Sequence, residues 1–109
     1  MTNTYKVLGQ SNPSATTATS LYTVPSSTAT IVSGIRVANR SSTATTFRVA
    51  IRPAGASLSN EHYIAYDVPV PGNDSIDIPG RLSLATTDVI TVYAGAATLS
   101  FSAYGVEIS

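Results

Sequence analysis

Apolar and polar residues alternate one by one along several short segments of this chain, and this period of two is the strongest constraint on its fold. The clearest segment is 46–52, where Phe47, Val49 and Ile51 alternate with arginine, threonine and alanine. The segment 62–70 follows the same pattern, and Ser, Thr, Pro and Gly interrupt it between segments. Because such alternation is typical of strands with one buried face, and no helical periodicity is present, the sequence predicts an all-β protein.

The segments are short and follow one another at intervals of about ten residues, which is the spacing of an all-β sandwich. We therefore expect one antiparallel β-sandwich, jelly-roll-like, with about eight strands. At 109 residues the chain fits a single domain over 1–109, in which residues 1–19 form an N-terminal strand and arm. A bend is expected at Pro79–Gly80, within the segment 75–84, because proline cannot donate to a central ladder.

The alternation also assigns side chains to faces. The strands expected at 28–39 and 46–52 are predicted to form a hairpin around residues 40–44. In an antiparallel hairpin, the numbers of two directly opposed residues always add up to the same value. An even value places the apolar residues of both strands on one face, whereas an odd value would oppose apolar and charged residues. These apolar residues are Ile31, Ile35 and Val37 in the first strand and Phe47, Val49 and Ile51 in the second. The buried core is expected to include Val37, Phe47, Val49, Ile51, Ile64, Tyr66, Val89 and Phe101.

The same hairpin would gather three arginines on its outer face. Arg36, Arg48 and Arg52 would then form a docking patch for an acidic neighbour. The alternative is a solvated outer face that protects the sheet from association. Since like charges repel, the cluster would require an acid such as Asp67 among them.

A second candidate contact region is the segment 11–20, which contains only Ser, Thr, Ala, Asn and Pro. We expect a polar arm that becomes ordered against a partner, since loose polar arms are usually disordered unless something holds them. Its candidate interface residues are Ser11, Asn12, Pro13, Thr16 and Thr17.

Residues that perform catalysis or bind metals are scarce. The chain has no Cys, one His and no Gly-x-Ser-x-Gly motif. A triad built on His62 would need Asp67 or Asp88 to orient it, and with thirty Ser and Thr residues a nearby hydroxyl is expected by chance. The spacing of Asp74, Asp77 and Asp88 does not match a calcium loop. We therefore expect no enzymatic activity, no metal site and no cofactor.

Charge is sparse and balanced along the chain, with 11% charged residues and a formal net charge of zero. This balance predicts neither a nucleic acid nor an anionic membrane as a partner. No apolar run approaches the ~20 residues of a membrane helix. A chain near zero net charge has little electrostatic protection against association, which favours contacts with itself and with other proteins.

The six tyrosines and two phenylalanines leave another role open. Tyr66 and Tyr93 lie in apolar strands and are expected in the core, while Tyr104 fits either face. The candidates for exposure are Tyr5, Tyr22 and Tyr63. Because exposed tyrosine suits protein interfaces and sugar stacking alike, a lectin-like domain stays among the alternatives.

Seven motifs follow one another in an order that is more specific than any single motif. They are YKVLGQ at 5–10, LYTVP at 21–25, VANR at 37–40, FRVAIRPAG at 47–55, HYIAYD at 62–67, TDVITVYA at 87–94 and FSAYGVEI at 101–108. Over residues 5–108 this ordered set resembles a family of small virion structural proteins of tailed phages, common in cyanophages and marine phages. The resemblance implies a non-enzymatic component of the virion, and it carries over no catalytic residues.

The resemblance leads us to expect a capsid decoration, or cement, protein that stabilises the particle. It would bind the assembled lattice as a homo-oligomer, with the major capsid protein as its main partner. The first alternative is a tail, baseplate or fibre-associated module that binds a tail protein. The second alternative is a lectin-like receptor-binding domain.

Overall fold

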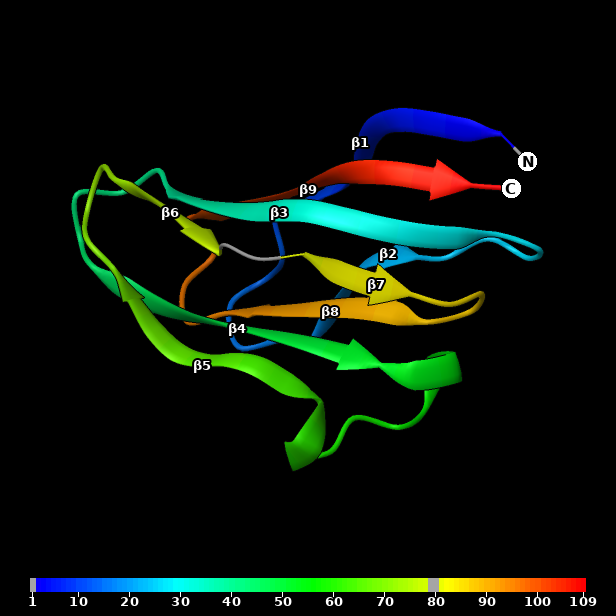
Figure 1. Cartoon of the computed structure of the whole chain (residues 1–109). Helices are drawn as coiled ribbons and strands as arrows, with labels where there is room; N and C mark the ends of the chain where they lie inside the picture. The colour runs from blue at the N-terminus through cyan, green and yellow to red at the C-terminus, as the bar shows by residue number, and fades with distance from the viewer. Residues whose placement is uncertain (1, 79–80) are drawn as a thin grey trace.

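Two antiparallel β-sheets pack face to face in the computed structural model, which describes residues 2–78 and 81–109 (Figure 1). The strands in this part of the chain are β1 (Asn3–Ser11), β2 (Thr19–Thr23), β3 (Ala29–Asn39), β4 (Thr45–Arg52), β5 (Tyr63–Val70), β6 (Ser75–Ile78), β7 (Leu82–Leu84), β8 (Val89–Ala94) and β9 (Leu99–Ile108). Sheet A has the order β1-β9-β3-β6, with β7 also paired to β3, and sheet B has the order β2-β8-β4-β5. Two single turns of 3₁₀-helix, η1 (Pro53–Gly55) and η2 (Asn60–His62), separate β4 from β5.

The topology is that of a jelly roll. Both β6 and β7 pair with β3, and together they occupy the place of the one strand expected over residues 75–84. With these two counted as one strand, the sheet orders become 1-8-3-6 and 2-7-4-5, an eight-stranded jelly roll. The predicted all-β, antiparallel, jelly-roll-like sandwich is therefore confirmed. The bend predicted at Pro79–Gly80 lies outside the described residues.

The hairpin predicted between β3 and β4 is wrong, because these strands belong to different sheets. Residues 40–44 instead cross from sheet A to sheet B at one end of the sandwich (Figure 1). The side-chain amide of Asn39, which is 4% exposed, holds this crossing. Its Nδ2 donates to the Thr43 carbonyl at 2.9 Å, and its Oδ1 accepts from the Ser41 N–H at 3.0 Å. Ile35 and Val37 on β3 still face the core, as do the apolar residues of β4, but they do so from opposite sheets.

The core fills the space between the two sheets. Phe47 on β4 and Phe101 on β9 are each 1% exposed, and their rings meet edge to face with centroids 6.1 Å apart. Val37, Val49 and Val89 are buried as predicted, whereas Ile51 is only partly buried at the edge of the core. Complete burial of a large apolar side chain stabilises the folded state by roughly 1.5–3 kcal/mol.

The alternation places Ile64 and Tyr66 in the core, but the structure exposes them by 44% and 56%. The cause is the pairing of β5 with β4, in which the register shifts twice and β5 gains an additional residue each time. Asp67 lies at one shift and adopts a φ of 50°. Each additional residue reverses the alternation for the residues that precede it in the strand. Val68 and Val70 therefore face the core, while the even-numbered Tyr66, on the other side of the shift, points outward.

A similar shift in β3 places Ile31, which was predicted to face the core, on the outer face of its sheet. The pairing of β3 with β9 has an additional β3 residue between Val32 and Gly34. The buried side chains before the shift are therefore on even-numbered residues and those after it are on odd-numbered residues, such as Ile35. Ile31 consequently lies on the outer face of sheet A instead of beside Ile35.

Candidate interaction surfaces

The three arginines predicted to form one patch lie on two different sheets. Arg36 is on the outer face of sheet A, where its Nη1 donates to Asp77 Oδ2 at 2.8 Å and its Nη2 donates to Ser75 Oγ at 3.1 Å. Arg48 and Arg52 belong to β4 in sheet B. The predicted arginine cluster is therefore wrong, because the connection between β3 and β4 crosses between sheets instead of forming a hairpin.

Arg48 is the centre of an aromatic cluster on the outer face of sheet B. Its guanidinium carbon lies 4.1 Å from the ring centroid of Tyr66 and 4.4 Å from that of Tyr93. Its Nε donates to Asp67 Oδ1 at 2.7 Å, and Tyr63 packs edge to face on Tyr66 with centroids 4.9 Å apart. The hydrogen bond to Asp67 raises the pKa of Arg48 further above its usual range, so the guanidinium stays charged.

This cluster leaves little free charge for an acidic partner. The Arg48 side chain is only 23% exposed because the two rings and a carboxylate surround it. Arg52 is also engaged, since its Nε donates to Thr91 Oγ1 at 2.9 Å and its Nη1 donates to the Ala56 carbonyl at 3.1 Å. Sequence reasoning missed the cluster because it placed both Tyr66 and Tyr93 in the core. Tyr93 is instead only partly buried and packs against Arg48, and the register shifts that expose Tyr66 leave no trace in the alternation.

The polar arm predicted at 11–20 is held by the domain itself. It connects β1 in sheet A to β2 in sheet B. Ala15 forms an isolated parallel bridge with Ala94, and the Thr16 N–H donates to the Ala94 carbonyl at 2.8 Å. The arm is therefore ordered by contacts within one chain, and its order does not require a partner.

The five arm residues predicted as an interface have different environments. Pro13 is buried, whereas Thr16 and Thr17 are exposed. Asn12 is exposed and its Oδ1 accepts from Arg40 Nη2 at 2.8 Å. A shallow depression of about 330 Å³ is lined by Gln10, Ser11, Asn12, Ser100, Phe101 and Ser102. Five of its six lining residues carry a hydroxyl or amide group that can form hydrogen bonds.

The outer face of sheet A carries an apolar surface at the end where β1 begins and β9 ends (Figure 1). Tyr5 is 80% exposed, Val7 is 56% exposed and Tyr104 is 39% exposed. The pairing registers place them with their neighbours in adjacent rows across β1, β9 and β3. We call this surface the apolar patch, and its members are Tyr5, Val7, Ile31, Tyr104, Val106 and Ile108.

Gly34 determines how Tyr104 lies on the apolar patch. A Cβ atom at position 34 would be 2.8 Å from Tyr104 Oη and 3.0 Å from its Cζ. The tyrosine ring therefore rests against the glycine backbone, in space that any side chain would fill. Sequence reasoning left Tyr104 on either face, and the structure places it on the outer one.

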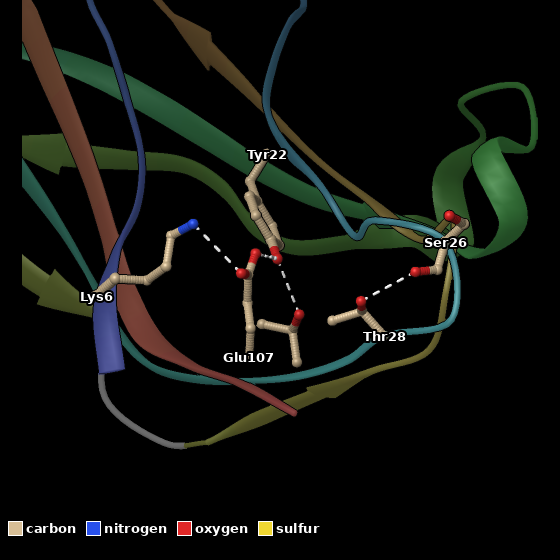
Figure 2. A network of polar contacts seen from close by, with 6 residues as sticks. Lys6, Tyr22, Ser26, Thr28 and Glu107 are labelled. Atoms are coloured by element: carbon tan, nitrogen blue, oxygen red, sulfur yellow. Dashed lines mark hydrogen bonds and ion pairs between the residues drawn. The ribbon is translucent and has the colours of Figure 1, made fainter. Parts of the chain in front are cut away.

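A polar network on the inner side of sheet A joins the two sheets at this end of the molecule (Figure 2). Glu107 on β9 accepts a hydrogen bond from Tyr22 Oη on β2 at 2.6 Å and pairs with Lys6 Nζ at 3.3 Å. Tyr22 Oη also lies 2.9 Å from Thr30 Oγ1 on β3. Burial and the hydrogen bond to Glu107 raise the pKa of Tyr22 to about 12. The hydrogen bond from Tyr22 lowers the pKa of Glu107 below its usual range.

The residues weighed for catalysis and metal binding are not brought together. His62 Nδ1 accepts from the Ser59 N–H at 3.2 Å, and Asp88 accepts from the N–H groups of Ala54 and Ala85 at 2.9 Å each. Over residues 2–78 and 81–109, no group of three or more His, Cys, Asp or Glu residues could hold a metal ion. In the same ranges, no helix has the length and apolar character needed to cross a membrane.

No protein-family model, no curated protein and no solved structure matches this chain. Its function is therefore inferred from its fold, its two outer sheet faces and its sequence motifs.

Proposed function

We propose that this protein is a non-enzymatic structural component of a virion, and that it acts as a capsid decoration protein. The proposal is carried by the apolar patch, where Tyr5 and Val7 are 80% and 56% exposed in the isolated chain. Contiguous exposed apolar surface of this kind is typical of protein–protein contact sites. Burial of the apolar patch against the major capsid protein and against copies of this chain would bind the protein to the lattice and stabilise the particle.

The fold and the motifs support the same proposal. Double-sheet jelly rolls recur in viral capsid domains and in lectins, although a fold by itself does not identify a function. The ordered motifs from 5–10 to 101–108 add the resemblance to small virion structural proteins. The formal net charge of zero fits attachment by surface burial, because no long-range attraction between opposite net charges is available.

The apolar patch also fits a second location in the particle, as a tail, baseplate or fibre-associated module with a tail protein as partner. Copy number separates the two locations. Mass spectrometry of purified particles of the encoding phage should find hundreds of copies of a decoration protein but only a handful of an adaptor or fibre module. Absence of the protein from such particles would contradict both.

The role of the apolar patch is tested by adding the purified protein to particles that lack it. Tyr5→Ser should weaken binding, because it removes the most exposed aromatic ring of the patch. Tyr66→Ser is the matched control, since it makes the same change at a 56% exposed tyrosine on sheet B. Full binding by the Tyr5 variant would contradict the apolar patch as the attachment surface.

One observation favours the lectin-like alternative, namely the aromatic cluster around Arg48. Tyr66 combines an exposed ring with a neighbouring carboxylate, and such groups suit sugar binding. Arg48 already lies 4.1 Å from the centroid of that ring, however, and occupies one of its faces. We expect glycan-binding measurements to detect no affinity that depends on Tyr66. Binding that Tyr66→Ser abolishes would favour the lectin-like function instead.

A further inference from the structure

We propose that β1 pairs antiparallel with β1 of a second copy of this chain, about a two-fold axis at Tyr5. The two copies of sheet A would then continue across the axis as one sheet, and the two apolar patches would meet on its outer face. The inference deepens the proposed function, since it names one partner of the apolar patch. It concerns the protein in solution and can therefore be tested separately.

The strand β1 is an edge strand with a free side. Among the described strands only β9 pairs with it. The N–H of Thr2 donates to the Ser109 carbonyl at 2.6 Å and the Ser109 N–H donates back at 2.9 Å, which shows that Thr2 faces β9. Backbone groups alternate along an antiparallel pair, so Thr4 and Lys6 also face β9. The groups that point to the free side are the N–H and C=O of Asn3, Tyr5 and Val7.

The other edge strands are shorter or interrupted. The strand β5 contains Pro69 and two register shifts. The strands β2, β6 and β7 have five, four and three residues. The strand β1 has nine residues, and the stretch before the register shift at Val7 contains neither a proline nor a bulge. Since natural proteins protect edges by shortness, proline and bulges, β1 is the edge best suited to accept another strand.

Lys6 is the single charged residue of β1. A lysine on an edge strand normally opposes pairing with another edge. Here its Nζ pairs with Glu107 Oε1 at 3.3 Å, on the inner side of sheet A (Figure 2). The charge of Lys6 is thereby balanced within its own chain, and the zero net charge allows two copies to meet without overall repulsion.

The free backbone groups select one register. Centred on Tyr5, the pairing sets Tyr5 against Tyr5 of the second copy and sets Asn3 against Val7, so all three residues exchange hydrogen bonds. Lys6 then lies opposite Thr4. A register centred on Lys6 would oppose two like charges, and one centred on Val7 would run into the register shift that follows it. The same pairing joins the apolar patches of the two copies. Tyr5 and Val7 supply both the free backbone groups of the edge and the exposed side chains of the patch.

Analytical ultracentrifugation over a concentration series tests the pairing. The unaltered protein should show a monomer–dimer equilibrium. Tyr5→Pro should shift it to monomer, with the Tm that the unaltered protein has at concentrations where it is monomeric. The reason is that proline removes the N–H on the free side and leaves the bonds to β9 in place. Lys6→Pro is the contrasting variant, since it removes a bond to β9 and should lower the Tm. A monomer at every concentration, or a dimer that Tyr5→Pro leaves intact, overturns the proposal.

Cysteine substitution tests the register without relying on the proline variant. The chain has no cysteine, and Cα atoms in a hydrogen-bonded antiparallel pair are about 5.5 Å apart, within reach of a disulfide. With oxidised glutathione as oxidant, Tyr5→Cys should form a cross-linked dimer. Val7→Cys should cross-link in a mixture with Asn3→Cys but not alone. Cross-linking of Val7→Cys alone, in preference to Tyr5→Cys, overturns the register.

The two proposals fail in different ways. A protein that is monomeric in solution but present in hundreds of copies on particles overturns the β1 pairing and leaves the decoration function in place. A dimer cross-linked through Tyr5→Cys, with no copies on particles, supports the pairing and overturns the function.

Discussion

Glu107 on β9 and Tyr22 on β2 share a 2.6 Å hydrogen bond that joins the two sheets at the end that carries the apolar patch. The Glu107 side chain is 16% exposed and also pairs with Lys6, so its charge is held in a mostly enclosed site. Buried polar groups of this kind stabilise a fold only while every partner is present. The side-chain contact between β2 and β9 at this end therefore depends on the ionisation of one carboxylate and one phenol.

Stability should fall in acid as Glu107 takes up a proton. The hydrogen bond from Tyr22 holds the pKa of Glu107 below its usual range in the folded protein. The resulting stability is present above the usual pKa of a glutamate and is lost as the pH falls through the lower, folded pKa. Glu107→Gln should therefore lower the Tm at neutral pH and reduce its decline in acid. An unaltered acid decline of the Tm in this variant would contradict the assignment.

Stability should also fall in strong alkali as Tyr22 ionises. Burial and Glu107 raise the pKa of Tyr22 to about 12. Neutral Tyr22 therefore stabilises the fold below the ordinary tyrosine pKa of about 10, and this contribution is lost as the pH rises toward the folded value. Urea unfolding at a series of alkaline pH values measures the loss. Tyr22→Phe should remove this part of the pH dependence, whereas Tyr5→Phe, at an exposed position, should not.

The Phe47 side chain should be among the most costly to truncate. It is 1% exposed and packs edge to face on Phe101, so alanine would leave a cavity between the sheets. Phe47→Ala should reduce the free energy of unfolding by about 3–5 kcal/mol. Ile64→Ala is the control, because this side chain is 44% exposed. A loss below about 1 kcal/mol for Phe47→Ala, from chemical denaturation, would contradict the described core.

Two glycines should differ sharply in their tolerance of alanine. A Cβ at Gly105 would collide with the backbone carbonyl of Ile31, which the paired strands hold in place. A Cβ at Gly34 would meet the Tyr104 ring, which can swing toward solvent. Gly105→Ala should therefore destabilise the protein by about 1–3 kcal/mol, and Gly34→Ala by less. Thermal or urea unfolding of the two variants compares them directly, and the reverse order would show that the ring cannot move.

Attachment to particles should resist salt. Burial of the apolar patch does not depend on exposed charges, and in about 1 M salt the screening length is only ~3 Å. Arg36→Gln should have little effect, since this arginine pairs with Asp77 on the exposed outer face of sheet A. Tyr5→Ser should release the protein more readily than Arg36→Gln does. Co-sedimentation with particles measures both, and release by moderate salt would point to charge pairing instead.

Local pattern was enough to predict the strands and where the chain breaks between them, but not what each connection joins. The alternation at 46–52 and the turn residues between segments define extended chain with one apolar face, and short strands at regular spacing lead to a sandwich. The same reasoning correctly predicted that Tyr5 is exposed and that Phe47 and Phe101 are buried. It wrongly expected Tyr22 to be exposed, because the contact of Tyr22 with Glu107 and Thr30 joins strands that are distant in sequence. It could not identify Val7 as part of a contact surface, because an edge strand with one open side has the same alternation as a central one.

Local pattern by itself determined which segments of this chain are strands. The period of two is a property of the extended backbone, and the short apolar run at 88–94 is typical of a strand buried on both faces. Only the tertiary structure decided which sheet each strand joins, since a connection such as 40–44 can close a hairpin or cross the sandwich, and the buried amide of Asn39 favours the crossing. The tertiary structure also decided the faces of Ile64 and Tyr66. A strand carries an additional residue where it must stay paired with a neighbour while both strands twist, and this residue changes the face of those beside it. That requirement arises from the partner strand rather than from local sequence.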